Sequence, residues 1–184
     1  MTFHKTKEEQ LKELKIVELA KKDSKHFGVL YERYHHEIFV FINKKTDDLN
    51  ASGDLTSQVF VKALQNLAKY EYRGVPFSAW LYRIASNETN LYFRNQSRQR
   101  AINIETPGLE KMIELFDPGE ERDIQPVITA IAKLKIEDVE LIELRFFEKL
   151  SYKEIAYIRN TTENNAKVKT FRVVKKIRKL MGLK

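Results

Sequence analysis

The side chains with the clearest binding chemistry stand close together near the C-terminus of the 184-residue chain. Amide and guanidinium groups can read base edges in the major groove of DNA, lysines can pair with phosphates, and an apolar side chain can pack on a thymine methyl group. From Ser151 onward ten basic residues oppose two acidic ones, a net charge of +8 against +7 for the whole chain. The candidate DNA-reading residues are Thr162, Asn164, Asn165, Lys167, Val168, Lys169, Phe171, Arg172, Lys175 and Lys176.

Two helices joined by a tight turn would present these side chains. Ser151 and Glu154 have the spacing of a capping box, which predicts a helix start at Ser151. Asn160 tolerates the left-handed conformation that an inter-helix turn needs, and Thr162 can cap a second helix. One side of that second helix is predicted to be core, and it carries Ala166, Thr170, Val173, Val174, Ile177, Leu180 and Met181. The pattern is that of a helix-turn-helix, with the candidate reading residues on the opposite side and its flanks.

Other kinds of site find no support in the sequence. The chain has no cysteine, which excludes disulfides and cysteine-based metal sites. His35 and His36 are adjacent, whereas two metal ligands on one helix face would stand four residues apart. Neither a nucleophile-base pair nor a glycine-rich phosphate loop is recognisable. We therefore expect no catalytic residues, no cofactor and no metal, and a protein that is not an enzyme.

Composition indicates an all-α fold. Glycine and proline are few, at six and four residues, while strong helix formers are abundant. The sequence pI near 9.4 indicates an anionic partner, and the concentration of charge on the helix-turn-helix favours nucleic acid over a membrane surface. No apolar run is long enough to cross a bilayer, so we expect a cytoplasmic protein without membrane insertion.

Four helices are predicted in the first half. They cover about residues 7–21, 27–42, 54–69 and 77–98. Residues 50–53 are predicted to form a turn, after which Asp54 would cap the third helix. The apolar face of the third helix would contain Leu55, Val59, Phe60, Ala63, Leu64 and Leu67. Residues 70–76 form a loop in this prediction, since Gly74 frees the backbone and Pro76 suits a helix start.

An acidic segment separates the two halves. Residues 105–123 contain seven acidic and two basic residues, a net charge of −5, together with two Pro-Gly pairs. We predict a flexible acidic linker with one short helix at residues 109–116. Two more amphipathic helices, at 124–133 and 137–148, would pack behind the helix-turn-helix. The predicted division is therefore a domain at 1–98, a linker at 99–123 and a domain at 124–184.

Five segments, in order along the chain, carry a family resemblance. They are Asp54–Leu64, Tyr72–Gly74, Pro76–Asn87, Leu144–Ala156 and Thr162–Lys169. Together they resemble the sigma-70 family of bacterial transcription initiation factors, specifically its extracytoplasmic-function group. The resemblance implies a region 2 helical bundle and a region 4 helix-turn-helix joined directly by a linker.

The resemblance also implies roles for three groups of residues. The first would bind the clamp helices of the polymerase β′ subunit: Asp54, Leu55, Ser57, Gln58, Phe60 and Val61. The second would capture a flipped base of the minus-ten element and hold the melted strand: Tyr72, Arg73, Gly74, Phe77, Trp80, Arg83, Asn87, Arg94 and Arg98. The third is the helix-turn-helix set from Thr162 to Lys176, which would read the minus-thirty-five element, and the polymerase β flap would be a further contact.

The predicted function is promoter recognition together with RNA polymerase core, by a protein that is monomeric when free and has an anti-sigma factor as a possible partner. Two alternatives are open at this stage. A stand-alone helix-turn-helix repressor would need a dimer surface to match paired half-sites, so a monomer in sedimentation would argue against it. A helical adaptor would bind a partner protein with the basic face incidental. Full activity of a Lys167, Lys169 and Arg172 triple alanine variant would favour the adaptor.

Overall fold

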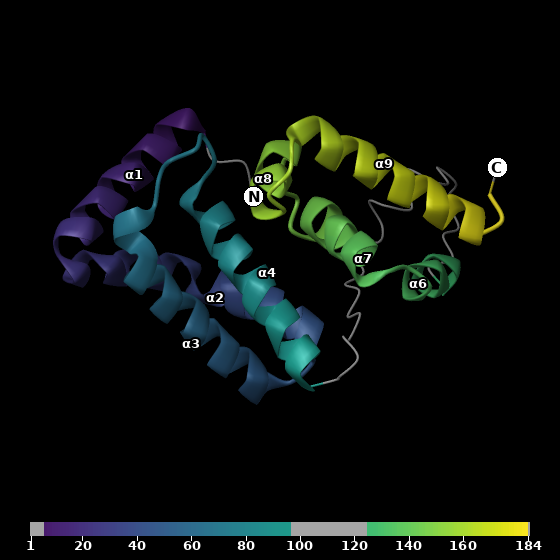
Figure 1. Ribbon diagram of the computed structural model, residues 1–184, viewed down its shortest axis with the longest axis horizontal. Helices are drawn as coiled ribbons and strands as arrows, with labels where there is room; N and C mark the ends of the chain where they lie inside the picture. The colour runs from purple at the N-terminus through teal and green to yellow at the C-terminus, as the bar shows by residue number, and fades with distance from the viewer. Residues whose placement is uncertain (1–5, 97–124, 184) are drawn as a thin grey trace. The chain divides into compact units, whose positions relative to one another are not determined.

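The computed structural model describes residues 6–96 and 125–183, and every regular element within these ranges is a helix (Figure 1). The first compact unit contains α1 to α4, and the second contains α6, α7, α9 and most of α8. The predictions of an all-α fold and of two helical domains are confirmed. The predicted linker at 99–123, with its short helix, lies outside the described ranges. Within those ranges no helix combines the length and apolar composition needed to cross a bilayer.

The first unit, drawn from purple to teal in Figure 1, is a helical bundle. Its helices are α1 (Lys7–Lys22), η1 (Ser24–His26), α2 (Phe27–Thr46), α3 (Leu49–Asn66), η2 (Leu67–Lys69) and α4 (Phe77–Gln96). Helices α2, α3 and α4 pack against one another in pairs, and α1 packs on α2 and α4. The apolar side chains fully removed from solvent at the centre are Val17, Leu30, Ile38, Ile42, Val59, Ala63, Leu81 and Ala85. Their burial is the main favourable contribution to folding of this unit.

Helix α3 begins earlier than the sequence predicted. Residues 50–53 are helical rather than a turn, and Asp54 lies inside the helix instead of capping it. The cap is Asp48, whose Oδ1 accepts hydrogen bonds from the backbone N–H groups of Asn50 and Ala51, both at 3.0 Å. The turn itself is at Asp47, with φ of +50°. The prediction was wrong because two aspartates six residues apart can each cap a helix, and turn-forming residues between them are compatible with a first helical turn.

This correction predicts different effects for the two aspartates. Asp48→Ala should lower the free energy of unfolding by about 0.5–2 kcal/mol, because it leaves two N–H groups of the first turn without their acceptor. Asp54→Ala is the matched control and should change stability by less than about 0.5 kcal/mol, as exposed helix-interior substitutions usually do. Thermal and denaturant unfolding followed by circular dichroism measures both. Equal losses for the two variants would contradict the assignment of the cap to Asp48.

The second unit, drawn from green to yellow in Figure 1, packs short helices against a long one. Its elements are α6 (Gln125–Ala132), α7 (Ile136–Ile142), the π-helical segment η3 (Glu143–Phe147), α8 (Tyr152–Ile158) and α9 (Glu163–Leu180). Helices α6 and α7 both pack on α9. The single helix predicted over 137–148 is divided, because the backbone widens into a π-helical turn after Ile142 and reverses at Lys149, where φ is +56°.

Two leucines predicted to be buried are exposed. Leu64 is 42% exposed and Leu180 is 40% exposed. Leu64 lies on the outward side of α3, and Leu180 is the last residue of α9. Periodicity identifies the apolar side of a helix, but it does not say how wide or how long the packing partner on that side is.

Candidate nucleic-acid interface

Helices α8 and α9 form the predicted helix-turn-helix, with the expected caps. At the start of α8, Ser151 N–H donates to Glu154 Oε2 at 2.7 Å, and Glu154 N–H donates to Ser151 Oγ at 3.2 Å. Asn160 adopts φ of +50° in the turn. Thr162 caps α9 by accepting a hydrogen bond from Asn165 N–H at 3.2 Å. Local side-chain chemistry therefore fixes where both helices begin.

Helix α9 has one buried and one exposed side. Ala166, Thr170, Val173 and Ile177 are buried against the rest of the unit. All ten residues predicted to read upstream DNA are exposed: Thr162, Asn164, Asn165, Lys167, Val168, Lys169, Phe171, Arg172, Lys175 and Lys176. The apolar side chain of Phe171 is 54% exposed among these polar and basic groups. The exposed side can therefore offer amides, cations and apolar contacts to one DNA groove.

Besides the capping Thr162, two of these ten residues have side-chain hydrogen bonds or ion pairs within the unit. The Asn165 side-chain amide donates from Nδ2 to Thr161 Oγ1 at 2.6 Å, which ties it to the turn. Lys176 Nζ lies 3.0 Å from Asp138 Oδ2 on α7. The turn therefore orients Asn165, and the pairing with Asp138 draws Lys176 toward α7.

The loop before α4 carries an exposed cation, Arg73, next to a half-buried aromatic side chain, Tyr72. Arg73 is exposed, with Nη2 3.4 Å from Glu71 Oε2, and Gly74 has φ of +72°, a conformation that glycine adopts without strain. Tyr72 is half-buried, whereas Tyr70 is only 5% exposed. Burial raises the pKa of the Tyr70 phenol above its ordinary value.

Helix α4 supplies a row of side chains that begins beside this loop. Trp80, Arg83, Asn87 and Arg94 recur at spacings of three, four and seven residues, so they share one face of the helix. Trp80 is half-buried, with its ring centroid 5.0 Å from that of Tyr70. Arg83 is half-buried, while Asn87 and Arg94 are exposed. Arg98, also predicted to contact DNA, lies outside the described residues.

Phe77 has a different position from the other predicted downstream residues. It is 2% exposed, and its ring centroid lies 5.2 Å from that of Tyr70 and 5.3 Å from that of Trp80. A side chain so deeply buried cannot reach a nucleobase without unfolding its surroundings. Phe77 therefore packs in the core against Tyr70 and Trp80, and we exclude it from the candidate DNA-binding surface.

Some of the residues predicted to bind polymerase are exposed, and the others are buried. Asp54, Ser57, Gln58 and Val61 are exposed on one outward stripe of α3, and Leu64 extends it. Leu55 and Phe60 point the other way and are each 4% exposed. Phe60 packs edge-on against the rings of Phe27 and Tyr31. Four of the six predicted residues are thus accessible to a partner, while two stabilise the bundle.

The described residues contain no group of three or more histidine, aspartate or glutamate side chains arranged to hold a metal ion. His35 lies in an aromatic cluster, where its ring centroid is 4.7 Å from that of Tyr31 and 6.0 Å from that of Phe60. This histidine is therefore explained by packing between α2 and α3.

Among the described residues, Glu13 is the most deeply buried acidic side chain, and its burial was missed at the level of sequence. Glu13 on α1 is 2% exposed, in a row with Val17 and Ala20, which are also buried. The signal was present, because residues 13, 17 and 20 have the spacing of one helix face and an acidic residue in an apolar row needs partners. Nothing in the sequence says which partners those are.

Comparison with known proteins identifies the family of this chain. The model of Sigma-70 region 2 matches residues 30–99, and the model of Sigma-70 region 4 matches residues 124–177. The RNA polymerase sigma factor YlaC of Bacillus subtilis is 30% identical over 135 residues, which cover 70% of this chain and 76% of that protein. The chain belongs to the sigma-70 family. It is a promoter-specific transcription initiation factor and not an enzyme.

Two further comparisons describe this sigma factor. The ECF RNA polymerase sigma factor BldN of Streptomyces coelicolor is 27% identical over 91% of the chain, and the chain spans 65% of that relative's length. Our sigma factor belongs to the same extracytoplasmic-function group. The fold is similar to that of the sigma factor RpoE of Bartonella quintana, solved in complex with the anti-sigma factor NepR, with 19% identity, a TM-score of 0.57 and coverage of 86% of this chain and 98% of that one.

Proposed function

We propose that this sigma factor binds bacterial RNA polymerase core and places it on promoters through two DNA-contacting surfaces. The exposed side of α9 binds the upstream duplex element. The loop at 70–76 and the exposed row of α4 bind the melted strand downstream. The observation that carries the proposal is that a basic, amide-bearing helix face and an aromatic loop followed by arginines occur in two separate units of one chain. The corresponding domains are 1–98 and 124–184, with 99–123 as the linker.

The upstream surface divides its contacts by chemistry. Arg172 and Asn164 carry the groups that form paired hydrogen bonds with guanine and adenine edges. Lys167, Lys169 and Lys175 flank them and pair with phosphates, which supply affinity but little base preference. Val168 and Phe171 add apolar contacts. Asn165, held by the turn, positions the start of α9 on the DNA backbone.

The downstream surface acts on single-stranded DNA. Extruding one base from the duplex costs a few kcal/mol, which contacts in the pocket must offset. Tyr72 and Trp80 offer aromatic faces on which a base can stack, each stacked base contributing about 1–3 kcal/mol. Arg73, Arg83 and Arg94 pair with the phosphates of the displaced strand. Base capture and strand binding together keep the promoter open.

Polymerase core holds the two surfaces at the spacing of the promoter elements. The outward stripe of α3, which consists of Asp54, Ser57, Gln58, Val61 and Leu64, binds the clamp helices of the β′ subunit, and the second unit binds the β flap.

The free protein is a monomer that binds promoter DNA weakly. It works in the cytoplasm, where polymerase and chromosome are found. As for the Bartonella relative, an anti-sigma factor is a partner that would block these surfaces.

Reconstituted transcription tests the proposal. Purified polymerase core is mixed with the full-length chain and a genomic DNA library, and the 5′ ends of the RNA products are sequenced. We expect initiation at a set of sites that share an upstream motif and a downstream motif at constant spacing. Initiation indistinguishable from that of core alone would contradict the proposal. So would equally tight and selective promoter binding by the chain without polymerase.

A further inference from the structure

Helix α1 contacts the base-capturing loop through polar side chains. Gln10 Oε1 accepts a hydrogen bond from the Tyr72 hydroxyl at 2.8 Å, in the middle of the loop. Lys21 Nζ donates to the backbone carbonyl of Tyr70 at 2.8 Å, where the loop begins. The paired residues are 62 and 49 positions apart in sequence. The contacts therefore exist only because the bundle lays α1 along the loop.

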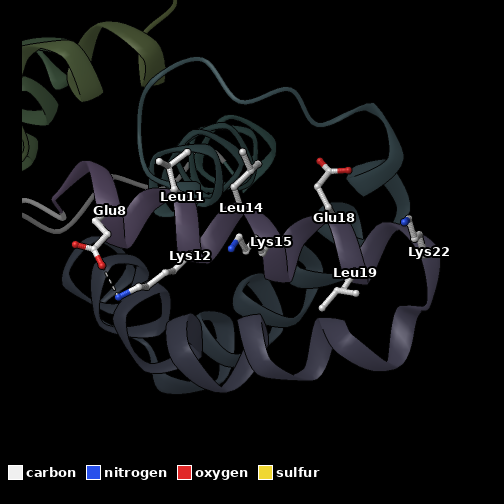
Figure 2. Close-up of a pocket in the computed structure, with 8 residues that line it drawn as sticks. All are labelled: Glu8, Leu11, Lys12, Leu14, Lys15, Glu18, Leu19 and Lys22. Atoms are coloured by element: carbon white, nitrogen blue, oxygen red, sulfur yellow. Dashed lines mark ion pairs between the residues drawn. The ribbon is translucent and has the colours of Figure 1, made fainter.

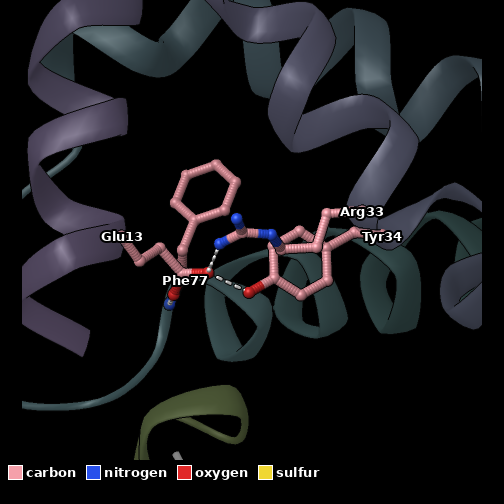
Figure 3. A network of polar contacts seen from close by, with 4 residues as sticks. All are labelled: Glu13, Arg33, Tyr34 and Phe77. Carbon is pink, nitrogen blue, oxygen red and sulfur yellow. Dashed lines mark hydrogen bonds and ion pairs between the residues drawn. The ribbon is translucent and has the colours of Figure 1, made fainter. Parts of the chain in front are cut away.

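A third contact holds the end of the loop, where α4 begins (Figure 3). The Glu13 carboxylate accepts a hydrogen bond from the backbone N–H of Phe77, the first residue of α4, at 3.1 Å. It also accepts from the Tyr34 hydroxyl and lies 3.4 Å from Arg33 Nη1 on α2. A buried carboxylate is tolerated only with such partners, and its charge is favourable at a helix N-terminus. One side chain thus joins α1, α2 and the start of α4.

Buried side chains anchor the two ends of the loop, at Tyr70 and at Val75 and Pro76, but its middle, residues 71–74, is not part of the core and needs further support. Residues 70–76 lie outside every helix, and Gly74 adds backbone freedom. Ordering such a segment only when DNA binds would cost conformational entropy and weaken the capture of a base. A loop that is already held in its binding conformation avoids this cost. The three contacts fall at its beginning, middle and end.

We infer that α1 is a brace that holds the loop in its base-capturing conformation, with Gln10, Glu13 and Lys21 as positioning residues that do not themselves touch DNA. This inference rests on the proposed function of the loop. It gives the N-terminal helix, which precedes the residues matched by the region 2 model, a specific part in promoter opening. Loss of the brace should affect capture of a base more than any other step.

The test measures base capture directly. Holoenzyme made from polymerase core and the full-length chain is titrated with single-stranded oligonucleotides of the non-template strand, each lacking one base. In the wild type, removing the captured base should weaken binding about 5- to 150-fold, the range that stacking of one base supplies. Glu13→Gln should abolish most of this penalty, and Gln10→Ala should reduce it about two- to tenfold, the range expected for one lost hydrogen bond. Penalties at other positions and affinity for upstream duplex should be unchanged.

The matched control is Glu8→Gln on the same helix. Glu8 lies on the outer side of α1 together with Lys12, with which it forms an exposed ion pair at 2.7 Å (Figure 2). This variant should keep the full penalty. Trp80, the only tryptophan, lies against Tyr70 and Phe77, so its fluorescence should change in the Glu13 and Gln10 variants but not in the control.

The possible failures can be told apart. A wild-type holoenzyme without any base-sensitive position would overturn base capture itself and the brace with it. A wild-type penalty that persists in full in both α1 variants would overturn the brace alone. If Glu13→Gln does not fold, as judged by circular dichroism, Gln10→Ala decides, because its half-buried side chain is not part of the core.

Discussion

Replacing Val61 with aspartate should lower transcription from every promoter by about 30-fold or more. Val61 is 53% exposed at the centre of the outward α3 stripe, between Gln58 and Leu64. A carboxylate placed in a desolvated protein interface costs about 2 kcal/mol or more, as at other interface hot spots. The fold should be maintained, because the side chain does not contribute to the core. Polymerase association is measured by titration of labelled sigma factor with core enzyme, and transcription by a single-round assay.

The control for this substitution is an equally exposed aliphatic residue on another helix of the same unit. Leu19, 49% exposed on the outer side of α1, has no proposed role in polymerase binding (Figure 2). Leu19→Asp should bind core like the wild type. Unchanged association of Val61→Asp would exclude the α3 stripe as the polymerase-binding surface. A similar loss in both variants would indicate a general effect of added negative charge.

Replacing Arg172 with alanine should weaken binding of holoenzyme to its upstream element by about 1–3 kcal/mol and relax the base preference at one position. The reason is that a guanidinium forms two hydrogen bonds with one base edge, and alanine forms none. Arg172 is exposed and lies on the side of α9 opposite the buried Thr170 and Val173. The measurement is a binding assay against a library of upstream elements with each position randomised in turn.

Lys169→Ala provides the comparison on the same helix. A lysine that pairs with a phosphate contributes to affinity for all sequences, so its loss should weaken binding evenly. The slope of log affinity against log salt concentration should become shallower by about one unit. An even loss over all sequences for Arg172→Ala would instead make Arg172 a phosphate contact. A base preference relaxed at one position in Lys169→Ala would instead make Lys169 a base-reading residue.

Much of the helix-turn-helix could be predicted from the sequence because its determinants are local. The Ser151 and Glu154 capping box, the left-handed Asn160 and the Thr162 cap each depend on residues within four positions of one another. The exposed side of α9 follows from helical periodicity alone. The start of α3 was missed where two local signals competed, and Asp48 capped the helix in place of Asp54.

At the predicted downstream site, tertiary structure decided which side chains face solvent. Helical periodicity had already placed Phe60, and not Val61, on the apolar side of α3, but it did not separate Trp80 from Phe77, because motif membership does not state which side of a helix is covered. The sequence determined the helices, the two-domain fold and the chemistry that each surface can offer. Glu13 and the N-terminus of α4 at Phe77 are 64 positions apart in sequence, and only tertiary packing brought them into contact. A hydrogen bond between such distant residues forms only when burial of the apolar helix faces places the two groups side by side.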